Sequence, residues 1–160
     1  MKKLLFMLMA VFMFSACGDE KEEITPEKPK ATLEKMEAME VITTMLEAPL
    51  DKVLEAYPGF RMYKDEDYGI YYYFELHNHT MLEGVELWSS ENIIKTVTLE
   101  AYEDGIHDED DFLREYFEKR GFTLEKEEPQ YYQFYMVNAK LSIRLRICEG
   151  HIEATKMLNT

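Results

Sequence analysis

The chain has 160 residues, of which 32 are acidic and 18 are basic, and its formal net charge is −14 at pH 7. Phosphate backbones repel so negative a protein, so we expect no nucleic-acid partner. Two cysteines are too few for a zinc-finger framework. Gly-x-Ser-x-Gly, His-Glu-x-x-His and glycine-rich phosphate loops do not occur in the sequence. We therefore predict a protein that is not an enzyme, with no catalytic residue and no cofactor.

The first residues form a short apolar segment that ends in a cysteine. Two lysines precede an apolar run over residues 4–14, and the letters SAC follow at 15–17. Such a run is shorter than the roughly 20 residues of a membrane-spanning helix and has the length of a secretory h-region. The pattern resembles the lipobox of bacterial lipoproteins, although Phe14 stands where that family usually has Leu, Val or Ile. The resemblance implies that residues 1–16 are a signal peptide, removed just before Cys17.

The same resemblance implies that Cys17 carries the lipid and attaches the protein to the membrane. Each buried acyl methylene contributes about 0.8 kcal/mol, so several chains make a stable anchor. The acidic letters DEKEE at 19–23 resemble the export signal of surface lipoproteins in Bacteroidota-type bacteria. We therefore expect a lipid-anchored protein of the cell envelope, at the outer membrane, facing either the surface or the periplasm. With Cys17 lipidated, only Cys148 remains, and no intramolecular disulfide can form.

A charged segment separates this cysteine from the rest of the chain. Residues 17–30 contain two prolines and little to bury, which predicts a flexible acidic tether. Residues 31–160 have the size of one domain. Apolar residues at three- and four-residue spacing predict helices, and alternating apolar and aromatic residues predict strands. We expect helices at 32–46, 49–57 and 109–120, and strands near 60–64, 69–76, 83–89, 93–102, 122–127, 130–137, 140–147 and 151–158.

This predicted order of elements suggests a duplication. The letters GFRMYKDE at 59–66 match GFTLEKEE at 121–128 in Gly, Phe and Lys and in the type of most other residues. We predict two helix-plus-four-strand units, at about 48–105 and 106–160; the open alternative is a chance match between two helix-to-strand junctions. Side by side, they predict an α+β fold, a curved antiparallel sheet of about eight strands with helices packed on one face. The arrangement is similar to tandem-repeat folds such as the β-lactamase inhibitor protein and the TATA-binding saddle, although no motif of either is present.

Three polar groupings have ordinary structural explanations. His77 and His79 point to the same side of an extended chain, as in half of a metal site, but turns after strands are often rich in His and Asn, and we predict no metal. The acids of HDEDD at 107–111 suit the start of a helix, where they compensate its dipole. Cys148 and His151 would need a turn between them to meet, and we predict no catalysis there.

The strands offer the strongest functional signal. Alternation predicts one open face that carries Tyr71, Tyr73, Tyr131, Tyr135, Arg144 and Arg146. It sends the other side of these strands into the core, including Ile70, Tyr132 and Leu141. Tyr and Arg dominate binding hot spots, although Tyr is also common in any half-exposed strand. We predict a non-enzymatic module that binds a protein or glycan; the alternatives are a small envelope hydrolase with an unfamiliar site and an accessory subunit of a surface complex.

Overall fold

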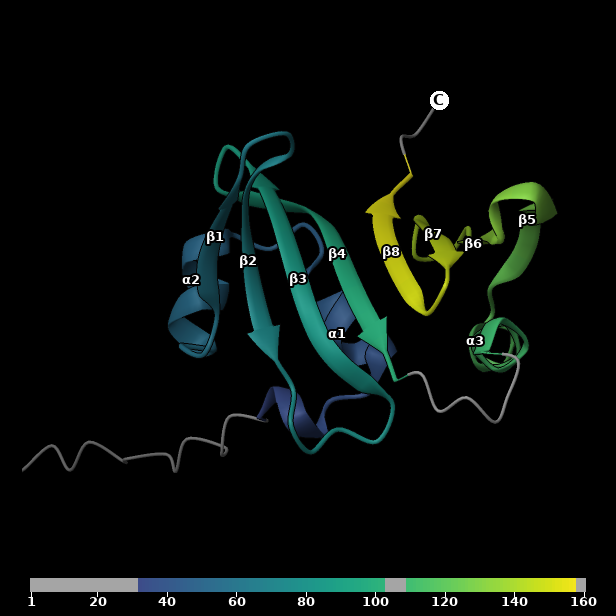
Figure 1. The fold of residues 1–160 in the computed structure, drawn as a ribbon, viewed down its shortest axis with the longest axis horizontal. Helices are drawn as coiled ribbons and strands as arrows, with labels where there is room; N and C mark the ends of the chain where they lie inside the picture. Colours follow the sequence, from purple (N-terminus) through teal and green to yellow (C-terminus); the bar gives the residue numbers. More distant parts are fainter. Residues whose placement is uncertain (1–31, 103–108, 158–160) are drawn as a thin grey trace, which may run out of the picture.

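The computed structural model describes residues 32–102 and 109–157. In these residues three α-helices accompany an eight-stranded antiparallel sheet, so the fold is mixed α+β and dominated by its sheet (Figure 1). The predicted signal peptide, Cys17 and the predicted tether lie outside the described residues. No helix within the described ranges is long and apolar enough to cross a membrane.

Each predicted helix and strand is present, with its ends moved by a few residues. The predicted helix at 32–46 is divided, because Met36 and Glu37 have extended backbones. In chain order the elements are η1 (Leu33–Lys35), α1 (Ala38–Met45), α2 (Leu50–Ala56), β1 (Arg61–Asp65), β2 (Gly69–Glu75), β3 (Leu82–Ser90), β4 (Ile93–Ala101), α3 (Glu109–Glu118), β5 (Thr123–Glu128), η2 (Pro129–Tyr131), β6 (Gln133–Asn138), β7 (Ile143–Cys148) and β8 (His151–Lys156).

The strands form one sheet in the order β1-β2-β3-β4-β8-β7-β6-β5, and every neighbouring pair is antiparallel. Strands β1–β4 make one meander and β5–β8 another, and the two meet where β4 pairs with β8 (Figure 1). This pairing places residues 96–100 beside residues 151–155 at the centre of the sheet. The edges of the sheet are β1 and β5.

One face of the sheet packs against the helices. Its buried side chains alternate along the strands: Val85 and Leu87 on β3, Val97 and Leu99 on β4, Leu145 and Ile147 on β7, and Ile152 and Ala154 on β8. In α1, Val41, Ile42 and Met45 recur at helical spacing and join the same core. The helices α1 and α2 lie behind β1–β4 in Figure 1. In α3, Arg114 lies 4.8 Å from the ring centroid of buried Phe134, so α3 covers the same face.

Three side chains that alternation assigned to the core are exposed instead. Tyr132 has a left-handed φ of 50° after η2, so β6 begins one residue later and the alternation stops before Tyr132. Leu141 lies in the turn before β7, next to Ser142 with a φ of 53°. Ile70 pairs with Lys64 near the end of the edge hairpin. The exposed fractions are 71% for Tyr132, 39% for Leu141 and 50% for Ile70.

Candidate functional site

The sheet face opposite the helices carries its side chains in cross-strand rows, because antiparallel partners point to the same side. From β1 to β5, the first row is Tyr63, Tyr71, Trp88, Thr96, Thr155, Arg144, Val137 and Thr123. The second row is Arg61, Tyr73, Glu86, Thr98, Glu153, Arg146, Tyr135 and Lys126. We call this surface the open face.

Five of the six predicted binding residues belong to these two rows. They are Tyr71 and Tyr73 on β2, Tyr135 on β6, and Arg144 and Arg146 on β7. Their outward orientation, which was inferred from alternation, agrees with the strand register. They do not form one compact cluster, because β3, β4 and β8 separate the tyrosines of β2 from the arginines.

The strand position predicted for Tyr131 is wrong, because β6 begins only at Gln133. Tyr131 is the last residue of η2, which begins at Pro129, and it is 63% exposed in the connection between β5 and β6. Its side chain therefore does not follow the alternation of β6. Its backbone carbonyl still lies beside the open face, where it accepts a contact of 3.7 Å from Sγ of Cys148.

A stacked row of aromatic rings occupies the β1–β3 part of the open face. The ring centroids of Tyr63 and Tyr71 lie 5.4 Å apart, and those of Tyr71 and Trp88 lie 5.2 Å apart. Tyr73 meets Tyr63 edge to face at 6.3 Å. Such offset and edge contacts each contribute about 0.5–1.5 kcal/mol beyond area burial. Sequence reasoning missed Tyr63 and Trp88, because the faces of β1 and β3 are known only once their pairing with β2 is known.

The two predicted arginines are held in ion pairs rather than standing alone. Arg144 Nε lies 2.7 Å from Oε2 of Glu125, and its guanidinium lies 4.9 Å from the ring centroid of Tyr135. Arg146 donates to Oε2 of Glu153 from Nε at 3.1 Å and from Nη2 at 2.6 Å. The open face is therefore not a basic patch, since acids neutralise both side chains.

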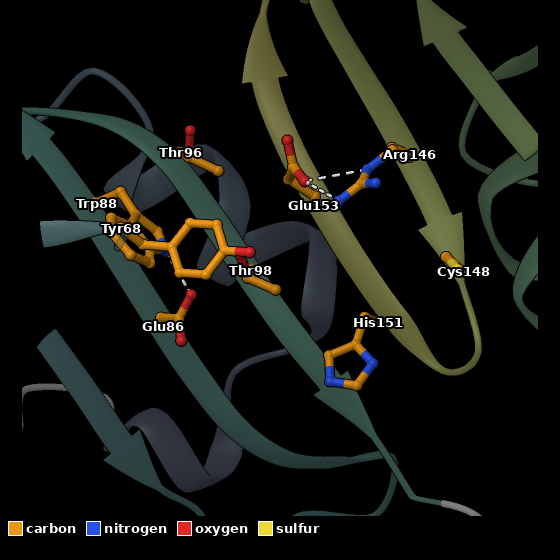
Figure 2. A pocket seen from close by; sticks show the side chains of 9 residues that line it. All are labelled: Tyr68, Glu86, Trp88, Thr96, Thr98, Arg146, Cys148, His151 and Glu153. Carbon is orange, nitrogen blue, oxygen red and sulfur yellow. Dashed lines mark hydrogen bonds and ion pairs between the residues drawn. The ribbon is translucent and has the colours of Figure 1, made fainter. Parts of the chain in front are cut away.

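A groove of about 510 Å³ lies on the open face above β4 (Figure 2). Its floor is formed by Thr96 and Thr98, which are short, while longer side chains rise from the strands on either side. Trp88 stands on the β3 side, together with Tyr68 from the β1–β2 turn. The full lining is Tyr68, Glu86, Trp88, Thr96, Thr98, Arg146, Cys148, His151 and Glu153. Because β4 and β8 join the two meanders, the groove lies along their junction.

The groove is acidic. Burial raises the pKa of Glu86, and the carboxylates of Glu100 and Glu153 raise it further, although a hydrogen bond from Trp88 Nε1 to Oε1 of Glu86 acts in the opposite direction. Tyr73 Oη donates to Oε2 of Glu100 at 2.7 Å. Burial and this carboxylate raise the pKa of the Tyr73 phenol. The site can therefore donate and accept hydrogen bonds, stack an aromatic or apolar group, and attract positive charge.

The histidines and cysteine have structural partners. His79 Nδ1 accepts the backbone N–H groups of Met81 and Leu82, and Nε2 lies 2.8 Å from the carbonyl oxygen of Met36, so both ring nitrogens are used. A turn at 149–150 does bring Cys148 opposite His151. Within 32–102 and 109–157, no group of three or more His, Cys, Asp or Glu side chains could hold a metal ion. Most of the HDEDD segment at 107–111 lies outside the residues whose side chains are described.

Comparison of the chain with protein-family models, with curated proteins and with solved structures found no match. The open face and its groove combine stacked aromatic rings, a polar floor and acidic side chains.

Proposed function

We propose that the chain is a lipid-anchored envelope lipoprotein whose open face binds another macromolecule, a protein or a glycan, without catalysing a reaction. The observation that carries this proposal is the aromatic row of Tyr63, Tyr71 and Trp88 beside the groove, on a sheet face opposite the helices. Rigid aromatic side chains on a preformed surface bind at a low cost in conformational entropy.

The anchoring half of the proposal rests on the sequence. The short apolar run that ends in Ser15-Ala16-Cys17 supports Cys17 as the lipidated residue and the outer membrane as the location. Changing Cys17→Ser should abolish incorporation of labelled palmitate and release the protein from the membrane fraction. Continued labelling, or continued membrane attachment of the variant, would contradict the anchor.

The binding half is tested by crosslinking the full-length protein in intact cells. Tyr68 is 78% exposed at the rim of the groove, whereas Phe112 is 50% exposed on α3, on the helix side. Tyr68→Ala should weaken capture of the partner at least about tenfold, as expected for a hot-spot residue, and Phe112→Ala should leave capture unchanged. Equal capture by both variants and the wild type would place binding elsewhere on the molecule.

A small envelope hydrolase is the second candidate, and Glu86 is the residue that favours it. A carboxylic acid with a raised pKa beside a second carboxylate is the arrangement that glycoside hydrolases use for general acid catalysis. Glu86 and Glu153 lie in one cross-strand row on either side of Thr98. Turnover of a glycoside by the full-length protein that Glu86→Gln abolishes would favour the hydrolase over the binding module.

The binding module would have arisen by internal duplication of a helix-plus-four-strand unit. The symmetric strand order supports this origin, because β1 and β5 are the two edges and β4 and β8 meet at the centre. Phe60 and Phe122 of the matched letters both pack toward the core. The two matched glycines, Gly59 and Gly121, meet different structural requirements, and this difference weighs against a duplication. Gly121 has a φ of 83°, whereas a Cβ on Gly59 would lie 2.4 Å from the ring of Phe74.

A further inference from the structure

The groove places two carboxylates on either side of one threonine. Thr98 lies on the floor, and Glu86 of β3 and Glu153 of β8 are its direct partners in the same row. Neighbouring strands are about 4.8 Å apart, so the backbones of the two glutamates are separated by roughly 10 Å. A charged nitrogen makes hydrogen bonds of about 2.8 Å to carboxylate oxygens. Two glutamate side chains at this separation can therefore hold one ammonium group between them when both turn toward Thr98. In the structure Glu153 pairs with Arg146 on its other side.

Both carboxylates have an oxygen that is available for such a group. Glu86 accepts the Trp88 N–H on Oε1, and both Arg146 hydrogen bonds to Glu153 end on Oε2. Among the described residues, no hydrogen bond reaches the other oxygen of either carboxylate. Figure 2 shows that the second oxygen of Glu153 points away from the Arg146 guanidinium.

The charge around Thr98 is negative. Glu100 is the next outward-facing residue of β4, so three carboxylates surround this position, and Arg146 is the cation that pairs with one of them. Three carboxylates and one guanidinium leave a local formal charge of −2 when His151 is counted as neutral, as in the net charge of the chain. Burial is the main cause of the raised pKa of Glu86, and Glu100 and Glu153 add to it, while the Trp88 hydrogen bond and His151 act in the opposite direction. The like charges of the carboxylates therefore oppose one another. A bound cation would offset that repulsion.

An aromatic wall stands beside the carboxylates. Trp88 on β3 is the cross-strand partner of Thr96 on β4. The Trp88 ring stacks on Tyr71, on the side away from the groove, at a centroid distance of 5.2 Å. Tyr68 lines the same side of the groove. Aromatic faces attract ammonium groups, most strongly in Trp, and they also pack against a methylene stem.

We propose that the groove binds an alkylammonium group, the head of a lysine side chain on a basic partner protein, between Glu86 and Glu153, with its methylene stem against Trp88. This inference rests on the proposed binding function and narrows it to one partner chemistry. The alkyl stem distinguishes the ligand from a bare metal ion, because only a ligand with methylene groups can pack against the Trp88 ring. The positive charge distinguishes the ligand from a neutral sugar, because only a cation is attracted by the carboxylates of Glu86 and Glu153.

The chain contains one tryptophan, and it lies in the wall of the groove, so its fluorescence reports occupancy of the site directly. The full-length protein is titrated with Nα-acetyl-lysine methylamide, and with the norleucine analogue, which lacks the charge but keeps an alkyl chain. We expect a saturable change in Trp88 fluorescence with the lysine probe. We also expect binding at least about tenfold weaker for the norleucine probe, and weaker binding of the lysine probe as salt is added. A lysine-containing peptide that binds more tightly than the single residue would point to a protein as the source of the group.

Two variants separate charge from structure. Glu86→Gln removes the negative charge but keeps an oxygen that can accept the Trp88 N–H. This variant should bind the lysine probe at least about fivefold more weakly than the wild type. Glu55→Gln removes a charge from an exposed side chain on α2, away from the groove, and should leave binding unchanged. The inference is overturned by an absent response, by equal binding of the norleucine probe or of a neutral methyl glycoside, or by unchanged binding to Glu86→Gln. In each of those cases, loss of partner capture in Tyr68→Ala would leave the proposed function standing.

Discussion

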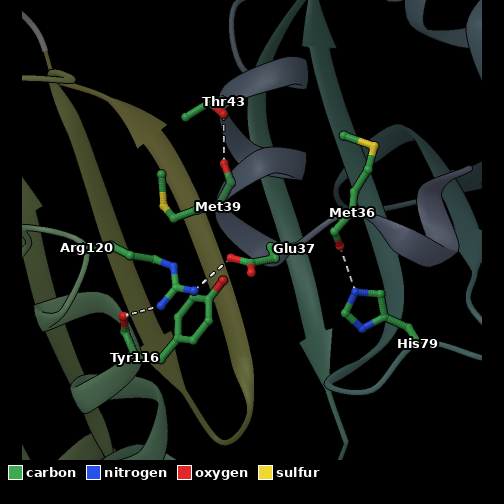
Figure 3. A network of polar contacts seen from close by, with 7 residues as sticks. All are labelled: Met36, Glu37, Met39, Thr43, His79, Tyr116 and Arg120. Carbon is green, nitrogen blue, oxygen red and sulfur yellow. Dashed lines mark hydrogen bonds and ion pairs between the residues drawn. The ribbon is translucent and has the colours of Figure 1, made fainter. Parts of the chain in front are cut away.

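Arg120, in the turn after α3, donates a hydrogen bond from Nη2 to Oε2 of Glu37, the residue before α1, at 2.7 Å (Figure 3). Its Nη1 donates to the carbonyl oxygen of Tyr116 at 3.0 Å, and its guanidinium lies 3.5 Å from the centroid of the Tyr116 ring. One planar side chain therefore connects the end of α3 with the start of α1.

We predict that Arg120→Lys lowers the free energy of unfolding by about 1 kcal/mol, because an ammonium group cannot make both hydrogen bonds and stack on the ring at once. Urea denaturation of the full-length protein measures the change. Lys119→Ala is the matched control, since Lys119 forms an exposed pair with Glu115 and should cost less than about 0.5 kcal/mol. If both variants lose the same free energy of unfolding, the planar geometry of the Arg120 guanidinium contributes no stability beyond that of its charge.

His79 connects the segment before β3 to the segment before α1. Because Nδ1 accepts two backbone N–H groups, Nε2 carries the proton and donates to the carbonyl oxygen of Met36 (Figure 3). We predict that His79→Ala lowers the free energy of unfolding by about 1–3 kcal/mol, because these backbone groups lose their partner. His77→Ala is the control, since the His77 side chain is 69% exposed, and it should have little effect. A rise in the melting temperature on addition of zinc would instead indicate that the two histidines act as metal ligands.

Glu34 should make stability depend on pH. Its carboxylate accepts the backbone N–H of Asn78 at 2.9 Å and that of His77 at 3.2 Å, and these bonds, the first above all, hold its pKa below its usual range. A lowered folded-state pKa stabilises the fold above the unfolded pKa of about 4.3, and the contribution is lost as the pH falls through the folded value. The wild type should therefore be more stable than Glu34→Gln near neutral pH, and the two should converge on acidification. Urea denaturation across this range tests the prediction, and a constant difference would contradict it.

The strands were predictable because their chemistry is local. In β7, Ile143, Leu145 and Ile147 are buried while Arg144 and Arg146 are exposed, which is the period-two pattern that the letters IRLRI contain. The error at Tyr131 and Tyr132 arose where alternation was continued through a turn. Pro129 is the local signal that indicated the break, since proline starts a turn more readily than it continues a strand.

The groove was not predictable in this way, because it depends on register between distant strands. Thr98 and Glu153 are adjacent only because β4 pairs with β8, and no local pattern specifies that pairing. Alternation within the predicted strand at 83–89 does place Glu86 and Trp88 on one side. Which side faces the helices is decided by the partners of β3, so these groove residues were missed.

Tyr73, one of the predicted binding residues, covers Gly84 on the neighbouring strand. A Cβ on Gly84 would lie 2.3 Å from Oη and 2.6 Å from Cζ of Tyr73, while the hydrogen bond from Oη to Glu100 holds the ring in place. We predict that Gly84→Ala lowers the free energy of unfolding by about 1–2 kcal/mol, because the ring must move away and give up that bond. Urea denaturation measures the loss.

The effect of Gly84→Ala on the free energy of unfolding should change sign when the Tyr73 ring is removed. In a Tyr73→Ala background, the three atoms nearest to the new Cβ are gone, and alanine is favoured over glycine within a strand by about 0.5–1 kcal/mol. Gly84→Ala should then be neutral or stabilising, and a double-mutant cycle gives the coupling between the two positions. If Gly84→Ala destabilises both backgrounds equally, the ring does not rest on Gly84. Tyr73 would then be a mobile side chain on the open face, and a partner that uses it would have to bear the entropy cost of ordering it.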